Sequence, residues 1–162
     1  MLLHNPSGMR FSQYNQCYRL DATHRYDIKG HNISARYSAG SSGLVSMYVY
    51  PFPPPRSVQL FDELFNAAMA DMLGTLETTS HVDERRTAFA HASSSLVLGR
   101  RCDASGTFRA EWVPKDFDRA FVELFIHDKW ILKIRGTYRG TFFSETEQFV
   151  ATWLATSTIG QS

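Results

Sequence analysis

Alternating apolar and polar residues in the first third of the chain predict two β-strands. At 33–38 and 45–50 the residues that would point to one side are apolar, so one face of each strand is expected to be buried. The glycine- and serine-rich run at 39–43 is typical of a turn. Together these segments predict a β-hairpin with one face on the core.

Two other segments have the spacing of amphipathic helices. The first is predicted to begin after Ser57, a suitable N-cap, and to end near Leu76. The second is predicted to begin at Ser144, which forms a capping box with Glu147, and to stop at Gly160. The first helix has the clearer apolar stripe, made of Phe61, Leu64, Phe65, Ala68, Met69, Met72 and Leu76.

The region between these helices is predicted to be rich in strands. Residues 77–87 are polar and charged, so we expect a surface connection there. Strands are predicted at 88–98 and at 107–112, with a turn at 103–106 between them.

The last two strands, at 120–126 and 130–136, are predicted to form a second hairpin. The length of its loop decides which side chains share a face. A two-residue loop would bury Glu123 on the same side as Trp130, whereas a three-residue loop would place Glu123 opposite Lys133, a favourable pair. We therefore predict the three-residue loop.

The predicted order is β-β-α-β-β-β-β-α, which lacks the regular βαβ alternation of a parallel sheet. The fold class is therefore α+β, with a single antiparallel β-sheet flanked by two amphipathic α-helices. Residues 1–16 are polar and are expected to form an irregular N-terminal arm, while 17–158 form one domain.

Composition narrows the class of protein but not its activity. The 162 residues are 43% hydrophobic with a formal net charge of +1, so no general attraction to nucleic acid is expected. No stretch is long and apolar enough to span a membrane. Cys17 and Cys102 are predicted to be free thiols of a cytoplasmic protein. A single bridge, in a periplasmic or secreted protein whose export signal was removed, is left open.

The sequence contains none of the common catalytic or ligand motifs. It has no P-loop, GxGxxG, HExxH, GxSxG or EF-hand pattern, and its six histidines lack the spacing of a local metal site. We therefore predict no catalytic residue, no metal and no cofactor.

Surplus aromatic and basic residues supply candidate binding surfaces. In the predicted register Phe121, Phe125 and Ile131 lie on the face opposite Trp130, where they either are covered by a helix or form an apolar binding patch. The same two alternatives, burial or a binding surface, apply to Tyr48 and Trp112. These five residues are the candidate partner-binding set. Lys133, Arg135 and Arg139 form a basic stripe, interpreted as a solvated face; an anion-binding role is left open.

The layout of elements resembles the PsbP-like superfamily, which includes Mog-like and DcrB-like proteins. The residues that carry the resemblance are 43–50, 130–138 and 144–150, which are similar to an early strand, the last strand and the final helix of that family. The resemblance implies a binding or assembly factor without catalysis, and in some bacterial relatives a chaperone for secreted effectors.

These observations rank three functions. The leading hypothesis is a non-enzymatic binding, adaptor or chaperone-like protein that recognises a protein partner. The alternative is a small-molecule-binding protein or small hydrolase-type enzyme with a pocket between sheet and helix, in which His91, Arg100 and Glu111 would be the polar groups. The third is a structural subunit of a larger assembly. A homodimer is compatible with each.

Overall fold

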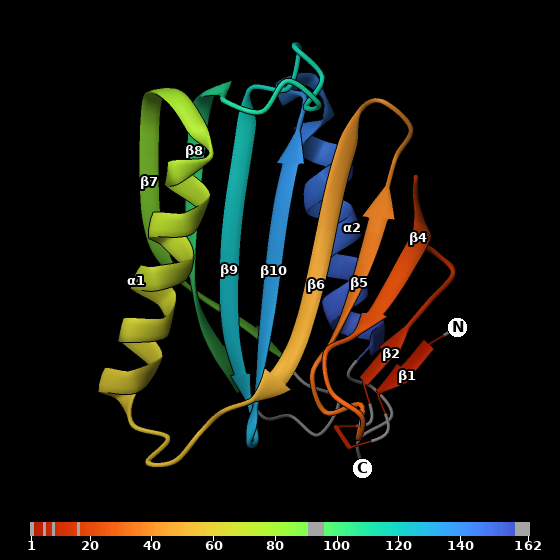
Figure 1. Cartoon of the computed structure of the whole chain (residues 1–162), viewed down its shortest axis with the longest axis vertical. Coiled ribbons are helices and arrows are strands. Elements are labelled where there is room, and N and C mark those ends of the chain that lie inside the picture. The colour runs from red at the N-terminus through yellow and green to blue at the C-terminus, as the bar shows by residue number, and fades with distance from the viewer. Residues whose placement is uncertain (1, 5, 8, 16, 91–95, 158–162) are drawn as a thin grey trace.

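The fold is built around one antiparallel β-sheet with a helix on each face. The computed structural model describes residues 2–4, 6–7, 9–15, 17–90 and 96–157. Helix α1 lies in front of the sheet and helix α2 behind it (Figure 1). From edge to edge the eight strands are β3 (Tyr14–Asn15), β4 (Tyr18–Arg25), β5 (Ile33–Ser38), β6 (Gly43–Pro51), β10 (Trp130–Tyr138), β9 (Arg119–His127), β8 (Leu96–Phe108) and β7 (Leu76–Ala90).

The predicted α+β class is confirmed, and the predicted order agrees with the elements from β5 to α2. Helix α1 (Val58–Gly74) begins as expected, because the Ser57 hydroxyl accepts a hydrogen bond of 3.0 Å from the Leu60 amide. A short 3-10 turn, η1 (Gly140–Phe142), leads into α2 (Phe143–Ser157). Among the described residues, no helix is both long and apolar enough to cross a membrane.

The N-terminal segment is more ordered than the irregular arm that the sequence predicts. Strands β1 (Leu2–His4) and β2 (Met9–Phe11) pair antiparallel with each other. Met9 and Phe11 are fully buried, and the Phe11 ring lies 5.5 Å from that of Trp153 in α2. Strands of three residues are too short to show a periodicity, which explains why the prediction was wrong.

The predicted boundaries in the middle of the chain were also wrong. The expected surface connection at 77–87 lies within strand β7, and the turn expected at 103–106 lies inside the continuous strand β8. Residues 77–86 are exposed on both faces of β7, so no apolar alternation marks that part of the strand. The strand expected at 107–112 is mostly the loop that follows β8.

The hairpin between β9 and β10 has a two-residue loop, so the three-residue loop predicted from the sequence was wrong. Trp130 is directly opposite His127, and Lys133 is opposite Leu124 rather than Glu123. Asp128 adopts a positive φ of 56° in this loop, a conformation that aspartate tolerates better than most residues. Glu123 therefore points to the same side as Trp130 and is buried there.

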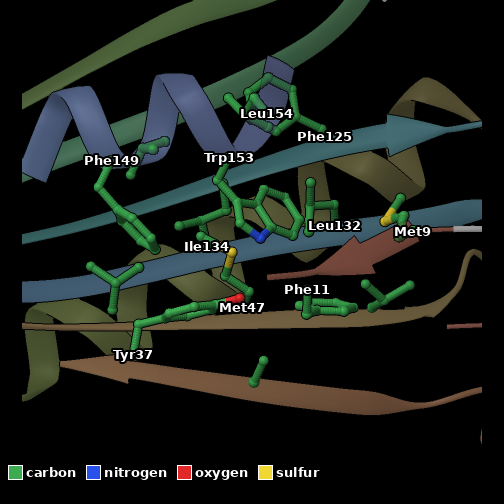
Figure 2. Close-up of a cluster of buried hydrophobic side chains, with 14 of the residues drawn as sticks. Met9, Phe11, Tyr37, Met47, Phe125, Leu132, Ile134, Phe149, Trp153 and Leu154 are labelled. Carbon is green, nitrogen blue, oxygen red and sulfur yellow. The ribbon is translucent and has the colours of Figure 1, made fainter. Parts of the chain in front are cut away.

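The sheet separates two hydrophobic clusters. Behind it, Trp153 and Phe149 of α2 pack against side chains such as Tyr37, Met47 and Ile134 (Figure 2). In front of it, Phe61, Phe65 and Met72 of α1 pack on β8 and β9. Cys17 is exposed and Cys102 is buried in the front cluster, and both are free thiols, as expected.

Candidate functional site

One half of the front face of the sheet is not covered by a helix. Helix α1 buries Val122 and Leu124 of β9, and at β10 only Ile131 belongs to its cluster. Beyond that, strands β10, β6 and β5 lie uncovered in front (Figure 1). Their front-facing side chains are partly exposed and mostly polar, unlike the apolar residues under α1.

Two arginines flank a serine in one row across this uncovered face. Arg36 of β5 and Arg135 of β10 are both the direct cross-strand partners of Ser46, which lies between them on β6. Two strand spacings separate the arginine Cα atoms by roughly 10 Å. Because the serine side chain is short, it leaves a gap between two long cationic side chains.

The next row of the sheet adds a third cation and an aromatic ring. Lys133 is opposite Tyr48, and its ammonium nitrogen lies 4.5 Å from the centroid of the Tyr48 ring. Burial lowers the pKa of Lys133, the positive charge of Arg135 lowers it further, and Asp71 opposes both effects. Lys133 and Arg135 therefore lie close enough on this face for their charges to repel each other.

A pocket of about 300 Å³ lies over the row of arginines. Its floor is formed by Arg36, Ser46 and Arg135 together with Leu44 and Tyr48 of β6. Its wall comes from Thr75 after α1, from Phe108 at the end of β8, and from the following loop with Trp112 and Val113. Trp112 is 74% exposed, although it is one of the largest apolar side chains of the protein.

The described part of the chain does not neutralise the arginines of the pocket. Among the described residues, no carboxylate forms an ion pair with Arg36 or Arg135. By contrast, Arg100 is paired with both Asp62 and Glu84, at 3.0 Å each, and Arg139 is paired with Asp116 at 3.7 Å. Two uncompensated guanidinium groups next to apolar walls are suited to bind a carboxylate or phosphate.

The structure divides the five predicted partner-binding residues into two groups. Tyr48 and Trp112 meet in the pocket. Phe121, Phe125 and Ile131 are at most 1% exposed, so they do not form the apolar binding patch that the sequence left open. They also do not share a face: the two phenylalanines belong to the cluster under α2 and Ile131 to that under α1, because the two-residue loop changes the register.

The predicted ligand-binding set is not assembled into one site. His91 lies outside the described residues. Arg100 is held by its two ion pairs and lies 4.3 Å from the centroid of the Phe65 ring. Glu111 is exposed in the loop after β8, where it borders a separate surface hollow. Within the part of the chain that the structure describes, no group of three metal-ligating side chains was found.

Part of the pocket could be anticipated from the sequence. Arg135 of the predicted basic stripe lines it, and Lys133 lies in the adjacent row of the sheet. Arg139 instead contacts Ser42 and Asp116. Arg36 was missed as a site residue, because its place beside Arg135 depends on the pairing of β6 with both β5 and β10. The alternating polar positions of β5 and β6 were the available signal.

A second cluster of charges is buried behind the sheet. The Arg101 side chain is 3% exposed; it donates a 2.9 Å hydrogen bond to Asp103 and is bonded to Glu147 of α2. Its guanidinium carbon also lies 4.2 Å from the centroid of the Phe121 ring. Burial raises the pKa of Glu123 to about 6, although the charge of Arg101 opposes this shift. Because Arg101 is satisfied by protein groups, we interpret this cluster as structural.

The chain matches no protein-family model, and no curated protein matches its sequence. The resemblance to the PsbP-like superfamily therefore stays a prediction.

Proposed function

We propose that this chain is a non-enzymatic binding protein that holds a small amphipathic anion in the pocket beneath Trp112. The observation that carries the proposal is the row of Arg36, Ser46 and Arg135, in which two cations without an ion-pair partner among the described residues flank a gap. Guanidinium groups bind carboxylates and phosphates through paired hydrogen bonds. The apolar wall would hold the body of the same ligand.

The lining of the pocket favours binding over catalysis. It offers hydroxyl groups from Ser46, Thr75 and Thr137, but its described lining includes no His, Cys, Asp or Glu. A hydroxyl nucleophile needs a neighbouring base to accept its proton. The hydrolase-type alternative therefore has no support from this pocket.

A protein ligand is the second candidate, as expected of an adaptor or chaperone-like protein. It is favoured by Trp112, which is 74% exposed at the rim of the pocket. Exposed tryptophan and arginine side chains are common where proteins bind one another. In this version an acidic side chain of the partner would occupy the position between the two arginines.

The first test is a calorimetric screen of small carboxylates and phosphates with aromatic, alkyl or no apolar bodies. Binding can be followed in parallel by tryptophan fluorescence, because Trp130 and Trp153 are buried and Trp112 is exposed. We expect the amphipathic anions to bind, and to protect the Trp112 fluorescence from an added quencher. Anions without an apolar body should bind more weakly.

Variants connect such binding to the arginines. The double variant Arg36→Gln/Arg135→Gln should weaken binding by about ten- to hundredfold for each lost charged hydrogen bond. The matched control is Arg10→Gln/Arg19→Gln, which removes the same charge from two exposed positions outside the pocket. Equal loss in both variants, or no binding by any anion in the screen, would reject the small-anion proposal. Acidic peptides then test the protein-ligand candidate.

A further inference from the structure

Strand β7 presents a long free edge at one end of the sheet. It contains 15 residues and pairs only with β8, so the backbone groups on its outer side have no strand beside them among the described residues. The opposite edge of the sheet is the two-residue strand β3. Short edge strands discourage pairing with other chains, whereas long ones are templates for it.

The second half of β7 has the regularity that pairing requires. The register with β8 shifts twice before His81, and from His81 to Ala90 it is continuous. Neither glycine nor proline interrupts β7. Residues 81–86 are exposed on both faces, so neither helix covers this part of the edge.

The charges on this edge are complementary to those on the same edge of a second copy, if the two edges pair antiparallel. Glu84 points to the front, since it is opposite Cys102 of the front cluster, and residues 82, 86 and 88 share its face. If a second copy pairs antiparallel about a two-fold axis at Arg85, Glu84 comes to lie opposite Arg86 of the second copy, and Val82 opposite Ala88. The same contacts occur twice because of the symmetry.

Charged side chains on an edge strand usually deter association. An edge with charges of one sign would repel a second copy. This edge instead has an acid and a base two residues apart on its front face, Glu84 and Arg86, which the proposed axis makes direct partners. On the back face the same axis places Asp83 opposite Thr87. Opposite charges that are direct cross-strand partners stabilise a pair of strands.

The existing ion pairs also fit this arrangement. Arg86 takes part in no ion pair among the described residues, so it is available to Glu84 of the second copy. Glu84 is bonded to Arg100 of its own copy at 3.0 Å, so its carboxylate would be shared between Arg100 and the second copy's Arg86. Arg85 would face its own copy at the axis, but each of these side chains is held by Asp103 at 2.7 Å and by Asp83 at 3.4 Å. The repulsion at the axis is thus screened by two carboxylates on each side.

We propose that two copies of this chain associate through antiparallel pairing of β7, centred on Arg85, to form one continuous sheet across a two-fold axis. The proposal is independent of the ligand pocket, because no residue of β7 lines that pocket. It commits to a second copy of this chain as the occupant of the edge.

Two single substitutions test the proposed register. Arg86→Glu makes the front face of the edge acidic, and Glu84→Lys makes it basic, so each variant should repel a second copy of itself. Sedimentation velocity of the full chain over a roughly hundredfold dilution measures the dissociation constant. We expect the wild type to dimerise, and each variant to have a dissociation constant about tenfold higher or more.

Mixing the two variants is the decisive control. In a mixed pair, Glu84 of the first variant faces the unchanged Arg86 of the second, and the introduced lysine faces the introduced glutamate. Both contacts are attractive, so an equimolar mixture should recover the dimer, which also shows that both variants are folded. A monomeric wild type, variants that dimerise as well as the wild type, or a mixture that stays monomeric would each overturn the proposal.

Discussion

Arg101 and Glu123 are direct cross-strand partners on β8 and β9, and both are buried behind the sheet. Their charged groups are 3.8 Å apart, while Arg101 is also bonded to Asp103 and Glu147. Two carboxylates from the sheet and one from α2 thus surround one guanidinium group. The position of the final helix is therefore connected to the sheet by charge as well as by apolar packing.

The first prediction concerns this buried pair. Replacement of Arg101 by Met would leave Glu123 buried without its cation, so we expect the free energy of unfolding to fall by about 3–5 kcal/mol. Urea denaturation measures the change. In the double variant Arg101→Met/Glu123→Leu the buried Glu123 charge is absent, so part of the lost stability should return, although Asp103 and Glu147 still lack Arg101. If the double variant is no more stable than the single one, the pair is not the cause of the loss.

The second prediction is a pH dependence that arises from Glu123. The pKa of this carboxyl is about 6 in the folded protein and ordinarily about 4.5, so the folded state binds the proton more tightly. This tighter proton binding by Glu123 stabilises the folded state by about 2 kcal/mol below pH 4.5. The stabilisation is lost as the pH rises through 6. The difference in unfolding free energy between wild type and Glu123→Gln should decrease over this window. A constant difference would contradict the raised pKa.

The third prediction concerns the close contact between a glycine and an aromatic ring. Gly136 of β10 is opposite Phe121 of β9, and a methyl group at Gly136 would overlap the phenylalanine ring. We expect Gly136→Ala to destabilise the fold by about 1–3 kcal/mol, which thermal and urea denaturation would measure. Gly74→Ala, where nothing lies within 4 Å, is the control and should leave the thermal midpoint unchanged or raise it.

The fourth prediction separates stability from binding at the proposed pocket. A carboxylate at position 46 would lie between Arg36 and Arg135, as a built-in replacement for the ligand. We expect Ser46→Glu to raise the unfolding free energy by about 0.5–1 kcal/mol and to abolish anion binding. Ser46→Ala should change neither property much. Anion binding that survives in the glutamate variant would place the ligand elsewhere.

Local patterns were sufficient to predict the class of fold and the first helix. The N-cap at Ser57 and the apolar stripe that follows it depend on neighbours within a few turns of the chain. The regular alternation in β5 and β6 likewise marks strands with one face on the core. These features need no knowledge of distant segments.

The predictions that failed depended on distant segments. Glu123 was predicted to pair with Lys133 because its actual cation, Arg101, comes from another strand, and the sequence does not show that the two meet. The edge strand β7 has no core face over much of its length, so its polar residues looked like a connection. The pocket was missed in part because Arg36 and Arg135 become neighbours only through the order of strands in the sheet.

The burial of β9 has a consequence for how the protein unfolds. Residues 120–125 are buried without interruption. Ala120, Val122 and Leu124 belong to the cluster under α1, Phe121 and Phe125 to that under α2, and Glu123 is buried on the α2 side with Arg101. A one-residue shift in the register of β9 would turn the side chains that face α1 toward α2 and the reverse, so both clusters would be disrupted together. We therefore expect the two halves of the interior to melt in a single cooperative transition, with the amide hydrogens of β9 among the last to exchange with solvent.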